Sequence, residues 1–398
     1  MFSSLKVRNF RIYWVGMLVS LIGTWIQLVA QSWLVFQLTN SAFLLGFVGF
    51  LSSIPVLLLS LFAGVLADRV EKRKILIATQ ILFMILAFLL GFLTQLKLVT
   101  PMQIMVIALL NGAVMAFDAP SRQAMVVELV GKAHLPNAIA LNSVAFNSSR
   151  IIGPALAGIL VAAIGMSGCF YLNGISFLAV IAALLFIRIQ TNVGEQHHKS
   201  PLKDLKDGLT FIKENPPILS LISMVGVVSL FGIAYVILMP IFANDVLHVG
   251  VKGLATLMSA SGIGALIGAL ILARLGDFKH KGTFLLSSAL IFSVSLIFFG
   301  ISRVYILSIV ALVFVGCTSV TSVALINTIL QTSVPDRFRG RVMSVFMITF
   351  AGIMPFGNLL AGSLAQGFGV SVAVMSGGIA CTLFFVIINF LYPKIREI

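Results

Sequence analysis

Three charged residues interrupt long apolar runs of this sequence and are its first candidates for chemistry. Asp118 and Arg122 stand four residues apart in one run, and Arg150 lies within a later run. A carboxylate in such surroundings can bind and release a proton as its exposure to water changes, and a guanidinium there needs an anion opposite it. These residues therefore indicate proton exchange, ion pairing or the binding of an anion.

Arg150 has two interpretations. It can attract an anionic or carboxylate-bearing substrate, or it can be held in a fixed ion pair with Asp118. At about 1.5 Å per residue along a helix, Arg150 falls near the middle of its apolar run, where a cation needs a partner. Both interpretations stay open on the sequence alone.

The histidines and cysteines do not form a recognisable reaction or metal site. Cys169, Cys317 and Cys381 lie inside apolar runs without CxxC spacing, as small buried hydrophobic residues do. The five histidines fall in expected loops or at helix ends, and none stands at chelating spacing to a carboxylate. We therefore expect no enzyme activity, no metal site and no cofactor.

The elements that must position these residues are membrane-spanning helices. Of the 398 residues 60% are hydrophobic and 10% are charged, whereas soluble domains are about 45–50% apolar and about 25% charged. A span needs about 20 apolar residues, so the chain has room for about twelve, and without water the backbone must be helical. We expect an all-α integral membrane protein with twelve transmembrane helices in two six-helix halves. The expected spans are 12–38, 42–66, 74–95, 101–124, 139–165, 168–189, 217–243, 251–275, 282–302, 305–331, 341–367 and 370–392.

Positive charge is distributed unequally between the two sides of these spans. All but three of the 26 Lys and Arg residues fall on one side, and the exceptions are Lys97, Lys252 and Arg303. The positive-inside rule then puts both termini in the cytoplasm, in a multi-pass protein of the cytoplasmic (inner) membrane. A nucleic-acid site would instead gather its charge on one soluble face, so the net charge of +14 does not indicate nucleic acid.

The two halves carry matching segments. Residues 64–72 and 273–281 both follow an even-numbered span and align Asp68 with Asp277 and Lys72 with Lys281, and residues 153–158 align with 357–362. We expect a first half at 1–189, a cytoplasmic linker at 190–216 and a second half at 217–398. Two halves of the same topology enclose a central cavity that opens when one rocks against the other, which favours a monomeric carrier over a channel.

The linker contains an amphipathic pattern. Leu205, Leu209 and Ile212 repeat at helical spacing, together with Leu202, opposite three lysines. This predicts a short helix that lies either on the inner membrane surface or in water as a linker helix.

A polar stripe runs along the first expected helix. Ser20, Thr24, Gln27 and Gln31 are separated by four, three and four residues and so share one helix face. Polar side chains facing lipid are unfavourable, so the stripe lines a central cavity or forms hydrogen bonds between helices.

The charged segment after the second span resembles a known signature. Gly64, Leu66, Asp68, Arg69 and the basic residues that follow are similar to the loop 2–3 motif G-x-L-A-D-R-x-G-R-K of the major facilitator superfamily, with Glu71 in place of its Gly. In that superfamily the motif latches the inner gate, because its Asp meets the positive end of a helix dipole. The resemblance implies a cytoplasmic gate motif made of Gly64, Asp68, Arg69, Lys72, Arg73, Asp277 and Lys281.

The same resemblance bears on Asp118 and Arg122, which are coupling or gate candidates. In the superfamily an acid near this place pairs with the loop 2–3 basic residues, here Lys72 or Arg73. We favour that latch for Asp118 over a role in proton coupling, and both stay open.

A second motif resembles the antiporter signature of the superfamily, g-x-x-x-G-P-x-x-G-G. Gly153, Pro154 and Gly158 match it, with Ala157 in place of a Gly. Pro removes a helix hydrogen bond and Gly allows close backbone approach, so this helix is expected to bend against a neighbour. Residues 135–143, 149–154 and 339–344 look like the branch that contains the enterobactin exporter and macrolide-efflux proteins.

What the resemblance implies is proton-driven efflux, by alternating access, of an amphipathic and possibly anionic small molecule such as a siderophore or a drug. The alternative is a lipid or lysophospholipid transporter of the same fold, because 32 Phe and 15 Met residues suit apolar ligands. The expected partners are the substrate, protons and the lipid bilayer. The candidate substrate-binding residues are Thr24, Gln27, Gln31, Asn111, Asn147, Arg150, Tyr235, Thr318, Thr321, Ser322 and Asn327.

Overall fold

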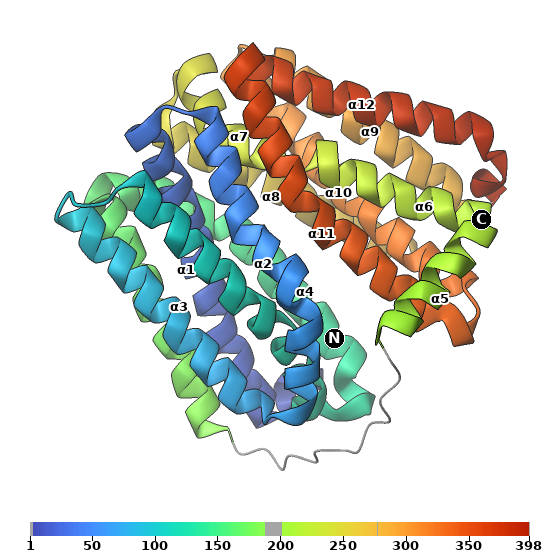
Figure 1. Cartoon of the computed structure of the whole chain (residues 1–398), viewed down its shortest axis with the longest axis horizontal. Helices are drawn as coiled ribbons and strands as arrows, with labels where there is room; N and C mark the ends of the chain where they lie inside the picture. The colour runs from blue at the N-terminus through green and yellow to red at the C-terminus, as the bar shows by residue number, and fades with distance from the viewer. Residues whose placement is uncertain (1–2, 188–200, 277, 398) are drawn as a thin grey trace. The chain divides into compact units, whose positions relative to one another are not determined.

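The computed structural model of the chain describes residues 3–187, 201–276 and 278–397, and every regular element in these ranges is a helix (Figure 1). The prediction of an all-α fold is confirmed. The elements are η1 (Ser3–Lys6), α1 (Arg8–Thr39), α2 (Ala42–Arg69), α3 (Lys72–Gln95), α4 (Pro101–Phe186), α5 (Pro201–Glu214), α6 (Pro216–Val227), η2 (Val228–Gly232), α7 (Tyr235–Ile241), η3 (Phe242–Val246), α8 (Gly250–Leu275), α9 (Lys281–Ile301), α10 (Tyr305–Ser333), α11 (Asp336–Phe368), α12 (Val370–Leu391) and η4 (Pro393–Glu397).

The long helix α4 contains three membrane crossings. Its backbone leaves the helical region at Gly131 (φ 66°) and Gly165 (φ 73°), which are conformations that glycine adopts without strain. Eleven stretches of the described chain are long and apolar enough to span a membrane, and one of them, Ala133–Phe186, has 54 residues. At about 1.5 Å per residue this stretch is roughly 80 Å long, enough for two crossings of a core about 30 Å thick. The described chain therefore has twelve spans, as predicted.

The seventh span, Pro216–Val246, is less regular than expected. It consists of α6 and α7 with the π-helical turns η2 and η3 after each of them. In these turns Ile233 N donates to Val228 O (2.9 Å) and Leu247 N donates to Phe242 O (3.0 Å). Pro240 lies inside α7 and has no N–H to donate, so the ordinary helical pattern is interrupted in this region.

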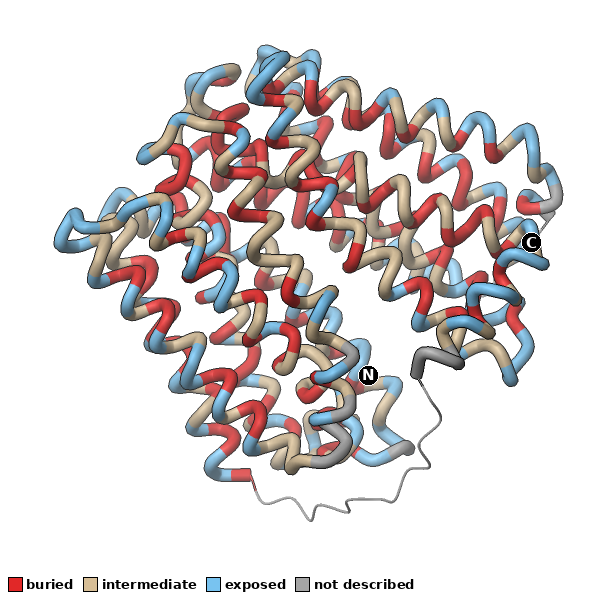
Figure 2. The backbone as a smooth tube through the Cα atoms, viewed as in Figure 1, coloured by how far each residue is buried: buried red, intermediate tan, exposed pale blue. Residues whose placement is uncertain are grey.

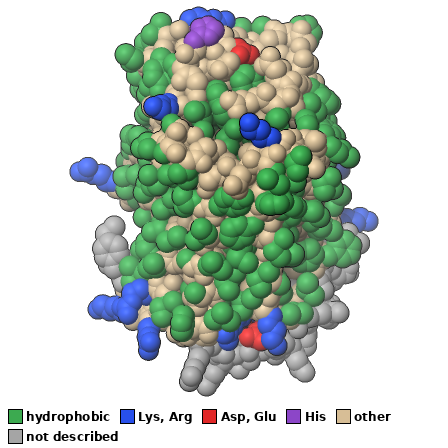
Figure 3. All heavy atoms as spheres, turned by 90° about the vertical axis from the view of Figure 1, so that its left-hand side faces the viewer, with side chains coloured by type: hydrophobic (Ala, Val, Ile, Leu, Met, Phe, Trp, Pro, Cys, Tyr) green, Lys and Arg blue, Asp and Glu red, His purple; other side chains and the backbone are tan. Residues whose placement is uncertain are grey.

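The helices form two compact units. Unit 1 contains residues 1–40, 51–196 and 251–259, and unit 2 contains residues 41–50, 197–250 and 260–398. Buried and exposed residues alternate along most helices at helical period (Figure 2). On the face drawn in Figure 3 hydrophobic side chains dominate, and charged side chains lie mostly toward its two ends. This distribution suits a bundle surrounded by lipid.

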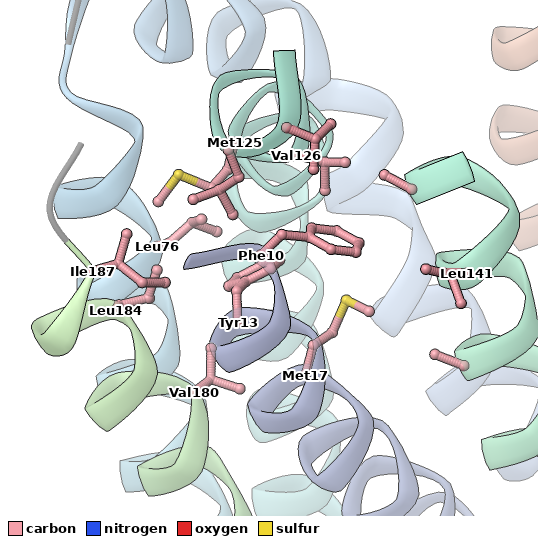
Figure 4. Close-up of a cluster of buried hydrophobic side chains, with 14 residues drawn as sticks. Phe10, Tyr13, Met17, Leu76, Met125, Val126, Leu141, Val180, Leu184 and Ile187 are labelled. Atoms are coloured by element: carbon pink, nitrogen blue, oxygen red, sulfur yellow. The ribbon is translucent and has the colours of Figure 1, made fainter. Parts of the chain in front are cut away.

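Unit 1 has a hydrophobic core around the N-terminal part of α1. Phe10 and Tyr13 are fully buried there, and Leu76 of α3 and Met125 of α4 pack around them (Figure 4). The N-terminal segment is also held by polar bonds, because Ser4 N donates to Asn137 Oδ1 (2.9 Å). This core determines which face of α4 meets α1 and α3.

The linker helix α5 packs on the beginning of α11. Asp207 of α5 pairs with Arg341 (3.2 Å), and the rings of Phe211 and Phe338 stack with centroids 4.4 Å apart. Ile212 is 2% exposed. The two sequence interpretations placed the apolar face of this helix on lipid or left it in water, whereas this part of it is covered by protein.

Candidate functional site

Asp118 is the centre of a buried hydrogen-bond network in unit 1. Its Oδ1 accepts from Thr79 Oγ1 (2.9 Å) and from Gln80 Nε2 (2.7 Å) of α3. Its Oδ2 accepts from Nε (2.9 Å) and Nη2 (2.8 Å) of Arg122, one turn along α4. The Asp118 side chain is 2% exposed, so every bond is made in a weakly polar interior. Taking away one charge of such a pair costs about 3–5 kcal/mol because the other is left buried alone.

Three buried polar atoms lie close to the Asp118–Arg122 pair. Tyr13 of α1 is in electrostatic contact with both members of the pair. In the described part of the chain Tyr13 Oη, Gln80 Oε1 and Arg122 Nη1 are buried and make no well-formed hydrogen bond. Buried polar atoms are usually satisfied. The Tyr13 hydroxyl and the Arg122 guanidinium lie within hydrogen-bonding reach of each other, so among the described residues Gln80 Oε1 is the acceptor of the three that lacks a nearby donor.

The partner that we predicted for Asp118 is wrong. Among the described residues its oxygens are bonded by Thr79, Gln80 and Arg122 rather than by Lys72 or Arg73. Lys72 Nζ instead pairs with Glu128 Oε1 at 2.7 Å. Glu128 lies about 15 Å further along α4 than Asp118, level with the start of α3.

Other residues of the predicted gate motif are only partly described. Arg73 Nη2 donates to Leu185 O (3.1 Å), and Lys281 is half-buried at the start of α9. A side chain at Gly64 would meet nothing within 4 Å. The side chains of Asp68 and Arg69, and Asp277 as a whole, lie outside the described residues.

The polar stripe of α1 divides into two parts. Gln27 is 8% exposed, and its Oε1 accepts from Asn173 Nδ2 (2.7 Å), in the last stretch of α4. Thr24 is exposed and donates to Ser20 O (2.9 Å), and Gln31 is half-buried. Gln27 therefore forms a bond between helices, which was one of the two sequence interpretations, while Thr24 and Gln31 keep accessible surface.

The remaining unit 1 candidates bond mostly to their own helix. Asn111 Nδ2 donates to Ile107 O (3.0 Å), and Asn147 Nδ2 donates to Ser143 O (2.8 Å). Arg150 is half-buried. Each of these side chains keeps some accessible surface, and their roles in binding substrate stay predictions.

In unit 2 the candidate residues are more deeply packed. Tyr235 Oη and Ser261 Oγ of α8 are 3.0 Å apart and hydrogen-bonded. The Thr318, Thr321 and Ser322 hydroxyls each donate to the carbonyl four residues back in α10, and all three side chains are at most 8% exposed. Asn327 Oδ1 accepts from Gln331 Nε2 (2.6 Å). In this arrangement Tyr235 and the three hydroxyls are held in the helix packing.

The glycines of the predicted helix-bending motif lie at close helix crossings. A side chain at Gly153 would collide with Trp25 and Ile22 of α1, and one at Gly158 would lie 2.7 Å from Ala255 of α8. Pro154 between them is buried. Both crossings belong to unit 1.

The aligned glycines of α11 make two matching crossings in unit 2. A side chain at Gly357 would lie 2.7 Å from Ser229 O of the seventh span, and one at Gly362 would lie 2.8 Å from Gly46 Cα of α2. The fifth span thus meets the first and the eighth, and the eleventh meets the seventh and the second. The same pattern of crossings occurs twice at aligned positions.

Comparison with known proteins decides what kind of molecule carries this pattern. The whole chain, residues 1–398, matches the model of a family described as transmembrane secretion effectors, within the major facilitator superfamily. The chain belongs to the major facilitator superfamily. It is thus a membrane transporter rather than an enzyme, and the resemblance read from its motifs is confirmed.

Several transporters are similar to this member of the superfamily over most of their length. The staphyloferrin A transporter of Staphylococcus aureus is 27% identical over 380 residues, which are 94% of each chain. The multidrug efflux pump Tap of Mycolicibacterium fortuitum is 25% identical over 386 residues, 94% of this chain and 93% of Tap. The enterobactin exporter EntS of Shigella boydii is 26% identical over 336 residues, 84% of this chain and 79% of EntS.

A solved transporter structure has the same fold. The crystal structure of a D-xylose–proton symporter superposes with a TM-score of 0.77 at 12% identity, and covers 97% of this chain and 99% of the symporter. The expected fold of the superfamily is therefore confirmed for this transporter.

Sequence reasoning missed Glu128 and Asn173 as partners. Glu128 is 21% exposed and paired with Lys72. Its pairing could have been suspected from its position, because Glu128 follows Asp118 on the same helix and lies near the membrane surface where the basic loop after the second span begins. Asn173 stands in an apolar stretch like other polar residues, and only the packing of α1 on α4 shows that it meets Gln27.

Proposed function

We propose that this transporter is a secondary active exporter that works by alternating access. Its substrate is an amphipathic small molecule of the siderophore or drug class, and protons are the coupling ion. The repeated glycine crossings carry the proposal. Backbones that touch through glycine have few interlocking side chains, so such crossings can shift as the helices rock.

The relatives support the direction and the substrate class. Their printed names include a staphyloferrin A transporter, a multidrug efflux pump and an enterobactin exporter. The half-buried guanidinium of Arg150 suits an anionic group on such a molecule. The accessible candidates Thr24, Gln31, Asn111 and Asn147 would give it hydrogen bonds.

The charge pattern supports a location in the cytoplasmic membrane with both termini in the cytoplasm. In this proposal residues 1–189 and 217–398 are the two six-helix halves and residues 190–216 connect them. A single chain carries both halves, so a monomer is sufficient for transport.

Transport by the purified protein in liposomes tests the function. The protein is reconstituted into liposomes with an acidic interior, and the uptake of enterobactin, staphyloferrin A, erythromycin or a lysophospholipid is measured for the molecules inserted inside-out. We expect accumulation of one of the first three compounds, which a protonophore abolishes. Accumulation that does not depend on the pH gradient would exclude proton coupling. If only the lysophospholipid is transported, the protein is a lipid transporter and the proposed export of siderophores or drugs is wrong.

A further inference from the structure

We propose that Asp118 is the carboxylate that takes up and releases the coupling proton, with Gln80 as its hydrogen-bond partner and Arg122 as the cation that each protonation releases. This proposal rests on the proposed function, because it names the coupling site of the exporter. Its physical basis is the arrangement of donors and acceptors around one buried carboxylate.

The Gln80 amide is placed to recognise the protonated form of Asp118. Gln80 Nε2 donates to Asp118 Oδ1 (2.7 Å), while Gln80 Oε1 on the same amide is buried and has no well-formed hydrogen bond to any described residue. A carboxylate cannot bond to that amide oxygen, because a carboxylate and an amide oxygen are both hydrogen-bond acceptors. A carboxylic acid can, since an acid and a primary amide pair through two hydrogen bonds at once. The unused acceptor is thus accounted for if Asp118 is protonated in part of the cycle.

Arg122 is bonded to Asp118 Oδ2, the oxygen that must take up the proton. Both of its bonds go to Asp118 Oδ2, because Oδ1 is held by α3. A proton on Oδ2 turns that acceptor into a donor and breaks these bonds. The pair then changes from neutral to a single positive charge on Arg122, whose side chain is 22% exposed, so the guanidinium turns to water or to another acceptor. Protonation therefore favours a different arrangement of α3 and α4.

The groups that face Asp118 from each neighbouring element suit this exchange. Tyr13 faces it from α1, Thr79 and Gln80 from α3, and Arg122 from α4 itself. Tyr13 Oη lies in electrostatic and hydrogen-bonding contact with Arg122, so it can hold the guanidinium when Asp118 becomes neutral. Apolar side chains such as Phe10 and Met125 pack around Tyr13, while the Arg122 side chain is 22% exposed.

The Lys72–Glu128 pair leaves Asp118 available for this role. The acid opposite the loop 2–3 lysine is Glu128, and the side chains of Lys72 and Glu128 are 16% and 21% exposed. Asp118 is about 15 Å away along α4 and shares no bond with that pair. Latching and proton binding are then tasks of two different carboxylates.

The proton balance of the step is simple. A hydronium ion from one compartment gives its proton to Asp118 Oδ2, where an O–H bond forms, and leaves a water molecule. In the other orientation this O–H bond breaks, the proton passes to water of the second compartment, and the carboxylate pairs with Arg122 again. No other reactant is consumed.

Infrared difference spectroscopy tests proton binding without any substrate. Spectra of the full chain in liposomes are compared between mildly acidic and mildly alkaline pH. We expect a carboxylic-acid carbonyl band that is lost in D118N, retained at a shifted position in D118E, and shifted in Q80L because one hydrogen bond to the acid is gone. The matched control is D336N, since Asp336 also pairs with an Arg on its own helix but is 88% exposed.

The control D336N should keep the band assigned to Asp118. A titration spectrum of D118N that is identical to that of the unaltered chain would overturn the proposal. If D118N does not fold, the double variant D118N/R122Q replaces it, because this variant removes both charges of the pair together.

Transport of enterobactin in acid-interior vesicles tests the coupling itself. For one proton per molecule, a gradient of about one pH unit sustains about tenfold accumulation, and we expect D118N to fall to no accumulation. Exchange of labelled for unlabelled enterobactin without a gradient should persist in D118N, because substrate binding is unaltered. Full gradient-driven accumulation by D118N would refute the assignment. If the unaltered chain moves no compound of the panel, the proposed function fails, while the infrared test still decides whether Asp118 binds a proton.

Discussion

At the scale of single residues, the charged side chains of unit 1 form two ion pairs in different surroundings. Lys72 and Glu128 both keep contact with solvent, whereas Asp118 is 2% exposed and has four bonds. Water reaches both members of the Lys72–Glu128 pair, so it can replace either partner when this pair opens. In the Asp118–Arg122 pair the carboxylate is buried while the Arg122 side chain is 22% exposed. A buried carboxylate favours losing its charge when it loses its partner, which is why the two pairs suit different tasks.

The pair between Lys72 and Glu128 can be tested by exchanging its charges. The single variant K72E places two carboxylates together and should slow transport and destabilise the fold by about 1–3 kcal/mol, because a charge-assisted bond is lost. The double variant K72E/E128K should recover most of both losses. Transport rates and thermal unfolding in detergent measure the effect.

The control for this exchange is K74E. Lys74 is 75% exposed and pairs with Glu71 at 3.2 Å, so its loss is worth at most about 1 kcal/mol. A double exchange that restores nothing would show that the contact of Lys72 with Glu128 does not contribute to transport.

Arg150 is the single residue that we expect to select substrates by their charge. R150Q removes the cation and keeps hydrogen-bonding capacity, so transport of anionic compounds such as staphyloferrin A should be abolished while neutral compounds still move. The comparison is made in the vesicle assay, with R303Q as control because Arg303 is exposed and bonds Ser371. Equal loss of anionic and neutral substrates would contradict a role of Arg150 in recognising charge.

At the scale of helices, glycine decides how closely the elements approach. Gly153 allows α1 to lie against the middle of α4, and Gly357 gives α11 the matching contact with the seventh span. The linker helix α5 behaves differently, since it is attached to α11 by an ion pair and a stacked pair of rings. The element contacts in both units are therefore specific rather than merely apolar.

Adding one methyl group at these crossings should be costly. G153A and G357A each force backbones apart and should lower the free energy of unfolding by about 1–3 kcal/mol. G367A is the matched control, because Gly367 is also helical and nothing lies within 4 Å of an added Cβ. It should be neutral or stabilising by up to about 1 kcal/mol. Equal stability of all three variants in thermal unfolding would refute close packing at Gly153 and Gly357.

At the scale of the whole molecule, the placement of charge predicts its orientation in the membrane. Lys97 and Lys206 are both exposed and fall on opposite sides of the predicted topology. In a variant whose three cysteines are replaced by Ala, K97C should react with an impermeant maleimide in right-side-out vesicles. K206C should react only after the vesicles are opened. The reverse pattern would invert the proposed orientation of both termini.

Much of this fold was predictable from the sequence because the decisive signals are local. Apolar stretches of about 20 residues specify spans whatever their neighbours are. The internal break at Gly165 was also foreseen, as the boundary between spans 139–165 and 168–189. The π-helical turns of the seventh span were not, because Pro240 alone does not show how the freed carbonyls are satisfied.

The sequence by itself determined that this chain is a multi-span helical membrane protein, which family signatures it carries, and which few polar residues enter the apolar region. Only the tertiary structure decided the partners: Asp118 with Gln80, Lys72 with Glu128, and Gln27 with Asn173. The physical reason is that hydropathy and helical period act within a few turns. Hydrogen bonds between helices depend on rotation and depth, which are set by how whole side-chain surfaces pack together.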